Sequence, residues 1–404
     1  MFTPPTLSDD MYRYVWDGRV QALGTGGETG ISPYLYPPDA PQLAGLRDRQ
    51  IWPLINRKSA VTVYPPAAQT AFAILWRIWP DNVHWFQFVM SAAGLLAGGL
   101  LVGLLKDLGR SSGRVLIFLW SPLLAFETAH SAHVDALVLP LLVSAWWARL
   151  RQRDSLVGIL LGLATAIKLY PVLIFPALWR PRHRQGRWRM PLAFAITLSA
   201  CYFPYLNSSG AQVIGFLPKY LRETFNTSPF IQLLYALFKP LNMDARQAVS
   251  LLMLASLVVI GFWMILRPAN SAEAAIRRCV WVIASFTLLS QNLFSWYMLW
   301  LLPLIAVFLA PGKPLQLWRF SIPTLRLDSW TGWWLFTGLV GLSYTFFIDW
   351  EPIPLAIWSQ YLPLYVFLLI DLGRKIRISE QPGWIPVHNW VARANIFPRT
   401  KKSD

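Results

Sequence analysis

Charged and aromatic side chains crowd together near the start of the chain, in the segment LSDDMYRYVWDGRV at residues 7–20. It contains two adjacent carboxylates, Asp9 and Asp10, followed by Arg13, Asp17 and Arg19. A carboxylate can take the proton of an attacking hydroxyl, and cations can hold a phosphate leaving group. If the segment is helical, Asp10, Arg13 and Asp17 share one face, and Arg13 can orient Asp10. The segment therefore has the residue types of an acid–base site.

A second set of ionisable residues lies inside strongly apolar sequence. Glu127, His133 and Asp135 occur in FETAHSAHVDALVLP (126–140), and Lys168 occurs in AIKLYPVLIFP. Such groups cost about 2.5 to 3.5 kcal/mol each at the centre of a bilayer, so they face a cavity or one another. The alternatives are an internal ion pair or helix cap for His133 and Asp135, and snorkelling to the interface for Lys168.

The composition identifies the class of protein that must position these residues. Hydrophobic residues make up 55% of the 404 and charged residues 14%, whereas soluble proteins have about 25% charged residues. The clearest apolar runs are near the roughly 17 to 20 residues that a spanning helix needs; they are 85–105, 190–206, 247–266, 331–348 and 355–371. We predict an all-α polytopic membrane protein.

The positive-inside rule predicts how the chain passes through the bilayer, because basic residues collect in cytoplasmic loops. The same rule explains the net charge of +16, so no nucleic-acid partner is needed to account for it. The basic clusters are 106–114, 149–154, 180–189, 267–278, 311–330 and the tail after 371. With all of them cytoplasmic, the chain makes about eleven crossings and ends inside. The segments 155–167 and 170–179 are then short crossings that meet at Lys168. The apolar segment 228–240 must lie at the outer interface without crossing.

This threading predicts three parts of the chain. Residues 1–84 form an extracytoplasmic leader, which Pro-rich and aromatic sequence builds from turns and short helices instead of strands. Residues 85–371 form the transmembrane bundle, with an outer loop at 207–246, and residues 372–404 form a cytoplasmic tail. Asp9, Asp10, His133, Asp135 and Lys168 then all lie on the outer side, so we expect one outward-facing pocket.

The start of the sequence is unusual for this topology, because neither a signal peptide nor a spanning helix precedes the leader. Either the start codon has been placed too far downstream, which we favour, or a first transmembrane helix has been lost.

Chemistry on the outer side has no ATP or nucleotide sugars, and the sequence has no G-x-x-x-x-G-K-[ST] loop. An enzyme there must take an activated donor from the membrane, for which a polyprenyl-phosphate sugar is suited. Asp10 can then serve as the base that deprotonates the acceptor. The candidate phosphate holders are Arg13, Lys168, Lys219 and Arg222.

The pattern Asp10-x-x-Arg13-Tyr14 resembles the acidic signature of the GT-C superfamily of integral membrane glycosyltransferases. Longer strings are similar to the bacterial mannosyltransferase-like glycosyltransferase family 87, also described as a domain of unknown function. They are DDMYRYVWDGRVQALG, SPYLYPPDAP, RDRQIWPLINRK, TVYPPAAQ, HVDAL, IKLYP, FNTSPF and SWYMLWLLP. Ser295 stands where the family pattern has His or Pro.

The resemblance implies a hexosyltransferase that moves mannose or another hexose from a polyprenyl-phosphate donor to a lipid or glycan acceptor, with inversion. It also implies that Asp10 is the catalytic base, with Asp9 adjacent to it. The residues expected to bind substrate are Arg13, Tyr14, Asp17, Arg19, Glu127, His133, Asp135, Lys168, Tyr170, Arg222, Trp296 and Tyr297.

Three alternatives remain open from the sequence. The protein could be a flippase or transporter of lipid-linked sugars, or a non-catalytic membrane scaffold. Trp296, Tyr297 and Trp300 could form an interfacial aromatic belt instead of a sugar-binding surface. We expect no cofactor and no bound metal, because the donor carries one phosphate that basic side chains could hold and no compact His/Asp cage appears; magnesium or manganese dependence would contradict this. Cys201 and Cys279 are far apart in apolar sequence and indicate neither a disulfide nor a metal site.

Overall fold

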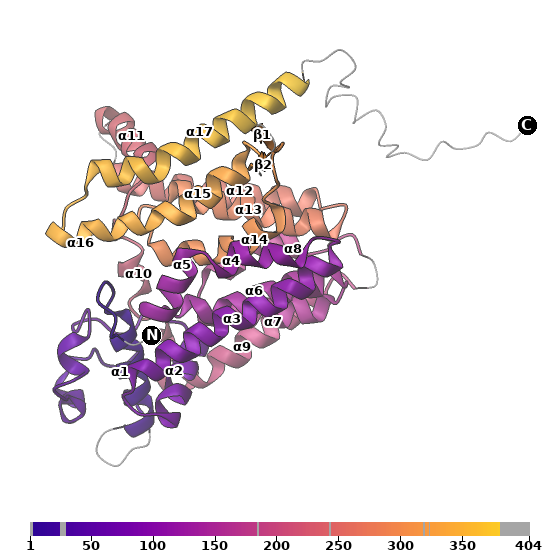
Figure 1. Ribbon diagram of the computed structural model, residues 1–404. Helices are drawn as coiled ribbons and strands as arrows, with labels where there is room; N and C mark the ends of the chain where they lie inside the picture. Colours follow the sequence, from indigo (N-terminus) through magenta and orange to yellow (C-terminus); the bar gives the residue numbers. More distant parts are fainter. Residues whose placement is uncertain are drawn as a thin grey trace, which may run out of the picture.

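The computed structural model describes residues 3–24, 30–183, 186–241, 244–317, 320–322 and 324–379. Helices dominate these residues, which confirms the all-α prediction (Figure 1). Within them the only sheet is a short antiparallel hairpin of β1 (Leu315–Leu317) and β2 (Phe320–Ile322). The predicted tail lies outside the described residues from 380 onward.

The leader forms helices and turns, as its composition predicted. Its helices are α1 (Asp10–Leu23), two 3₁₀ turns (Pro41–Leu46 and Trp52–Leu54) and α2 (Pro66–Ile78). α1 is buried from Met11 to Val20, although this stretch carries charges, because α2 and the two 3₁₀ turns of the leader pack against it. Gly18 allows α1 to cross α2 closely, since a Cβ there would lie 2.5 Å from the carbonyl oxygen of Phe72.

Four long helices form the first half of the bundle and pack pairwise in the order α3, α6, α7, α9 (Figure 1). Their bounds are α3 (Val83–Asp107), α6 (Asp135–Leu150), α7 (Asp154–Ile167) and α9 (Arg189–Ser209). Small residues permit the tightest of these contacts. A Cβ at Gly158 of α7 would lie 2.3 Å from the carbonyl oxygen of Met190 in α9.

Short elements connect these long helices. A 3₁₀ turn (Ser112–Arg114), α4 (Val115–Leu119), α5 (Pro122–Ala125) and a π-helical turn (Phe126–His130) lie between α3 and α6. After α7 come a 3₁₀ turn (Tyr170–Ile174) and α8 (Phe175–Leu178). The two predicted short segments are therefore both short, and Lys168 lies between them in extended backbone.

The second half of the chain begins with a 3₁₀ turn (Gly210–Ile214) and the short helix α10 (Leu217–Tyr220). The remaining elements are α11 (Pro229–Phe238), a 3₁₀ turn (Lys239–Leu241), α12 (Ala245–Leu266), α13 (Ala272–Leu289), a 3₁₀ stretch (Ser295–Leu301), α14 (Leu302–Phe308), α15 (Ser329–Leu339), a 3₁₀ stretch (Val340–Thr345), α16 (Phe346–Asp349) and α17 (Pro354–Ser379).

Two of the predicted apolar runs in this half do not coincide with single helices. The run 331–348 is not one helix, because α15 ends at Leu339 and a 3₁₀ stretch separates it from α16. The run 355–371 lies within a longer helix, since α17 extends from Pro354 to Ser379. In both cases hydropathy located the apolar residues but not the ends of the helices.

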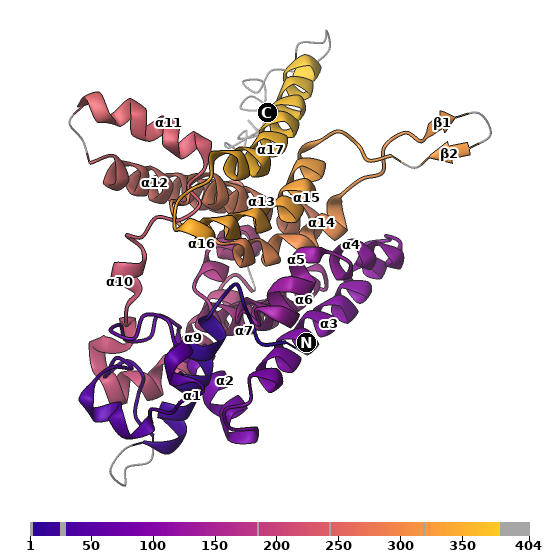
Figure 2. The same cartoon turned by 60° about the vertical axis from the view of Figure 1, so that its left-hand side comes forward.

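Three helices among the described residues are long and apolar enough to cross a membrane: Val83–Asp107, Ala245–Leu266 and Pro354–Arg374. They support a membrane protein, whereas the eleven crossings and their orientation stay predictions. In the view of Figure 1, α1, α10 and α16 lie toward the left and α8, the β1–β2 hairpin and the end of α17 toward the right. In Figure 2 the leader helices α1 and α2 lie at the lower left, away from α15, α17 and the β1–β2 hairpin in the upper part of the view.

Candidate active site

A cavity of about 1460 Å³ lies between the leader and the second half of the chain. Its wall is formed by residues from the segments 5–13, 53–65, 168–173, 216–225, 246–257, 286–297 and 346–350. Most of the predicted site residues line it, namely Asp9, Asp10, Arg13, Lys168, Tyr170, Arg222, Trp296 and Tyr297. The N-terminal carboxylates and Lys168 therefore lie in one cavity, as predicted, whereas His133 and Asp135, which were expected to share it, are not part of its wall.

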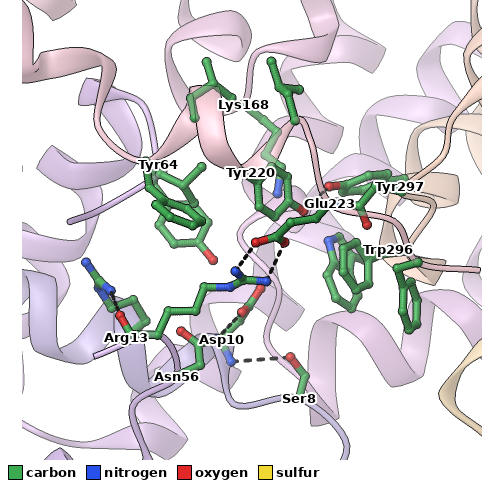
Figure 3. Close-up of a pocket in the computed structure, with 18 of the residues that line it drawn as sticks. Ser8, Asp10, Arg13, Asn56, Tyr64, Lys168, Tyr220, Glu223, Trp296 and Tyr297 are labelled. Carbon is green, nitrogen blue, oxygen red and sulfur yellow. Dashed lines mark hydrogen bonds and ion pairs between the residues drawn. The ribbon is translucent and has the colours of Figure 1, made fainter. Parts of the chain in front are cut away.

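Asp10 is the first residue of α1 and is held from two sides (Figure 3). Its Oδ1 accepts a hydrogen bond of 2.7 Å from Asn56 Nδ2, and its backbone N–H donates to Ser8 Oγ at 3.4 Å. Within the described chain its second carboxylate oxygen accepts no hydrogen bond, so this oxygen is available to take a proton.

Asp9 shares the same amide, because Asn56 Nδ2 also donates to Asp9 Oδ1 at 2.9 Å. Desolvation by the surrounding protein, and then the charge of the adjacent Asp10, raise the pKa of Asp9 above its ordinary value of 3.8. The two neighbouring carboxylates are thus held by one side chain but do not have equivalent environments.

Arg13 has a different partner from the predicted one. Its Nε lies 2.8 Å from Asp17 Oδ1, with both side chains buried, and Gln69 Nε2 donates to Asp17 Oδ2 at 2.9 Å. The expectation that Arg13 orients Asp10 is therefore wrong: Asp17 lies one turn further along the buried face, and Asn56 takes the orienting role. Arg13 still reaches the cavity wall.

Arg19 and Tyr14 are not part of the cavity wall in the described structure. Arg19 forms ion pairs with Asp48 and, at 2.7 Å, with Asp81, which tie the loops of the leader to α1. The Tyr14 ring stacks on Phe72 with centroids 4.5 Å apart. The substrate-binding roles predicted for Tyr14, Asp17 and Arg19 do not fit these positions, because burial in the leader core separates them from the cavity.

Lys168 points toward the cavity and pairs behind it with Asp135. The Lys168 Nζ lies 3.0 Å from Asp135 Oδ2, and the Asp135 side chain is fully buried. The ammonium also lies over the rings of Tyr64 and Tyr297, at 5.7 and 5.5 Å from their centroids. Snorkelling is thus the wrong interpretation, whereas the internal ion pair is correct for Asp135.

Glu127 and His133 form a second buried pair, linked to the loop that carries Asp10. His133 Nδ1 lies 2.8 Å from Glu127 Oε2, and His133 Nε2 lies 3.1 Å from Ser8 Oγ. Ser8 in turn accepts the backbone N–H of Asp10. Glu127 and His133 therefore lie behind the cavity wall, in contact with its N-terminal loop, and not in the wall as predicted.

The aromatic segment after α13 is buried and does not form an interfacial belt. Trp296, Tyr297 and Trp300 are less than 8% exposed, and Trp296 stacks on His133 with centroids 3.8 Å apart. Ser295, the departure from the family pattern, donates a hydrogen bond of 2.5 Å to Glu127 Oε1. This serine therefore completes the polar layer behind the cavity.

Several polar residues of the cavity could not be predicted from the sequence. Asn56 holds Asp10, Arg57 forms a bidentate ion pair with Glu223, and the Tyr220 hydroxyl bonds to that of Tyr297 (Figure 3). Asn56 and Arg57 lie in the quoted string RDRQIWPLINRK, but nothing in their spacing indicated which carboxylate they face.

Three of the four candidate phosphate holders line the cavity, namely Arg13, Lys168 and Arg222. Lys219, on α10, is not among the lining residues. Arg222 makes no ion pair within the described residues.

One side of the cavity is apolar. It is formed by Leu173 and Phe286 together with Met253, Leu254 and Leu257 of α12. α12 is one of the helices long enough to span a membrane. The cavity thus combines a polar end at Asp10 with an apolar wall on a helix that is long enough to span a membrane.

The described residues contain no cluster of three or more His, Cys, Asp or Glu side chains that could hold a metal ion. Lys168 pairs with Asp135, and His133 with Glu127, so these acids have partners already. Independence from metal stays a prediction.

The fold and the cavity define an all-α membrane protein with a carboxylate and cations beside an apolar wall. The family model described as "Glycosyltransferase family 87" matches residues 62–291, which is more than half of the chain. The chain belongs to this family.

A fungal protein is also similar to part of the chain. It is GPI mannosyltransferase 1 of Gibberella zeae, which is 32% identical over 107 residues. The match covers 25% of this chain and 25% of the fungal protein. No solved structure matches the chain.

Proposed function

We propose that the protein transfers a hexose from a polyprenyl-phosphate donor to a lipid or glycan acceptor on the extracytoplasmic side, with Asp10 as the general base. The observation that carries this proposal is the position of Asp10. Its unbonded carboxylate oxygen lies in a cavity that has cations at one end and apolar residues of α12 on one side. Such a cavity has separate surfaces for a phosphate and for a prenyl chain.

The reaction is a single displacement. The acceptor hydroxyl attacks the anomeric carbon, the bond between that carbon and the phosphate oxygen breaks, and Asp10 takes the proton of the hydroxyl. Polyprenyl phosphate leaves with the bonding electrons, and basic side chains stabilise its added charge. Attack opposite the leaving group inverts the anomeric carbon.

Mannose is the first sugar to test, because the fungal relative is named as a mannosyltransferase and the family resemblance implies a hexose. The aromatic rings of Tyr64, Tyr220, Trp296 and Tyr297 line the cavity and offer flat surfaces for a sugar ring.

The test is transfer from a panel of polyprenyl-phosphate mannose, glucose, galactose and arabinose by membranes that contain the protein. Asp10→Asn keeps the shape of the side chain but removes the base, so turnover should fall by about 100- to 10,000-fold. Asp9→Asn should lower turnover by a smaller factor than Asp10→Asn. Asp39→Asn, which removes an acid of the leader outside the cavity wall, should match the wild type.

The outcome also separates the alternatives. A flippase would move lipid-linked sugar without transferring it and would be indifferent to Asp10→Asn. Failure of the wild type to transfer or hydrolyse any donor of the panel would support a scaffold. Full turnover by Asp10→Asn would remove Asp10 from the mechanism.

A further inference from the structure

An ion pair crosses the polar end of the cavity, between segments far apart in the sequence. Arg57 belongs to the leader, and Glu223 belongs to the loop that follows α10. Arg57 Nη2 donates to Glu223 Oε2 at 2.6 Å, and Nη1 bonds to Oε1, so the contact is bidentate. Figure 3 shows Glu223 projecting into the cavity between Asp10 and Tyr220.

The position of Arg57 is fixed relative to the proposed base. It follows Asn56, whose amide holds Asp10. Its backbone is in the left-handed region, with φ of 46°, and its carbonyl oxygen accepts hydrogen bonds from Ala60 N at 2.9 Å and Arg13 Nη1 at 3.5 Å. Adjacent residues therefore carry the group that orients the base and a guanidinium in the same cavity.

The surroundings of the Arg57 guanidinium suit an anion that accepts two hydrogen bonds from it. Its carbon lies 5.5 Å from the ring centroid of Phe216 and 5.8 Å from that of Tyr220, so two rings limit its orientation. Two parallel N–H donors fit a phosphate as well as a carboxylate. Glu223 thus occupies the position that a phosphate needs.

Two of the other cations in the cavity wall are less available than Arg57. Arg13 is buried against Asp17, and Lys168 is paired with the fully buried Asp135. By contrast, the side chains of Arg57 and Glu223 are 41% and 30% exposed. An exposed ion pair exchanges partners at little cost, because water compensates the carboxylate that leaves.

We propose that Arg57 binds the phosphate of the lipid donor and that Glu223 is an internal substitute for this phosphate, which the donor displaces. This inference rests on the proposed function. Displacement also removes the ion pair between the loop of Glu223 and the leader. The hydrogen bond from Phe216 N–H to the Thr62 carbonyl oxygen remains, so donor binding would loosen the link between the two sides of the cavity without breaking it.

The experiment measures binding of farnesyl phosphate and of farnesol to the purified full-length protein, without a sugar and without turnover. Arg57→Gln should weaken binding of farnesyl phosphate by about 10- to 100-fold, the value of a charged hydrogen-bonded contact. Glu223→Gln should tighten it by about two- to fivefold, because the competing exposed ion pair is lost. Neither variant should change binding of farnesol.

The double variant gives the sharpest result. If Glu223 acts only by competing for Arg57, the double variant binds farnesyl phosphate like Arg57→Gln alone, and the gain of Glu223→Gln disappears. Arg222→Gln removes an equal charge from the cavity wall and should weaken binding by less than about threefold. Asp107→Asn breaks a distant exposed ion pair with Arg151 and should have no effect.

Several results would overturn the proposal. Unchanged binding by Arg57→Gln would do so, as would unchanged or weaker binding by Glu223→Gln, which would mean that the pair only holds the loop. If Arg57→Gln does not fold, Arg57→Lys serves in its place, because lysine keeps the charge but lacks the two parallel N–H donors of arginine. Arg57→Lys should bind farnesyl phosphate more weakly than the wild type but more strongly than a variant without the charge. Selective binding of farnesyl phosphate that ignores Arg57 would refute this inference alone, whereas no preference over farnesol would refute the proposed donor class as well.

Discussion

Replacing Lys168 with methionine tests the electrostatics of the cavity wall most directly. Lys168 is 17% exposed, whereas its partner Asp135 is fully buried at the start of α6, with 3.0 Å between Nζ and Oδ2. Methionine has a similar length but cannot compensate the carboxylate. The variant therefore leaves a buried charge without its ion-pair partner.

The structure sets the expected magnitudes. Removing one partner of a buried ion pair costs about 3 to 5 kcal/mol, so Lys168→Met should lower the free energy of unfolding by that amount. Asp135→Asn should cost about 1 to 3 kcal/mol, because Lys168 can still turn toward the water of the cavity. The double variant should be more stable than Lys168→Met, since it has no uncompensated charge.

The assay is unfolding of the purified protein in detergent, followed for the four members of this double-mutant cycle. The decisive observation is the order of stability. If Lys168→Met unfolds like the wild type, or if the two substitutions have simply additive costs, the ion pair has no energetic role and the reasoning fails.

The remaining predictions concern the base, its supports and metal. Asn56→Ala should lower kcat by up to about 100-fold with little change in donor KM, because Asp10 loses its orienting donor; steady-state kinetics would show an unchanged kcat if Asn56 were irrelevant. Ser8→Ala should lower kcat by less than Asn56→Ala does. If the contact between Ser8 and His133 positions Asp10, His133→Ala should lower kcat by the same factor as Ser8→Ala. The raised pKa of Asp9 means that the folded protein holds this proton more tightly than the unfolded chain, so stability is lost as the pH rises through the folded pKa. Asp9→Asn should therefore melt at a higher temperature than the wild type at pH 7, with the difference vanishing below pH 3.8. Chelation of divalent cations should leave transfer unchanged, and activity that is abolished by a chelator and restored by magnesium or manganese would contradict the proposal.

Residue types and the predicted topology brought the N-terminal carboxylates and Lys168 to one side of the membrane, whereas the choice of Asp10 as the proposed base came from the family resemblance. A carboxylate pair near the start of an apolar chain and a lysine between two short helices are both expensive in lipid unless a polar chamber holds them. Asp10 and Lys168 could therefore be assigned to one cavity before any contact was known. Aromatic residues were less informative, because Trp296 suits an interfacial belt as well as a buried wall.

The interactions between side chains could not be predicted in this way. Helical spacing allowed Arg13 to face Asp10 or Asp17, and only the burial of α1 within the leader selects Asp17. Arg19 has the same charge as Arg13 but pairs with Asp48 and Asp81 of the leader loops. Charge alone could not separate a cavity residue from one that holds the leader together.

The sequence by itself determined the class of this protein, because the hydrophobic effect and the cost of charge in lipid act on composition and apolar length, which are local properties. Only the tertiary structure decided that Asn56 holds Asp10, that Arg57 meets Glu223 and that Glu127 lies behind the cavity wall. The reason is that each of these contacts joins segments whose separation in the chain exceeds any helical or strand period, so packing of the whole leader against the bundle selects the partner.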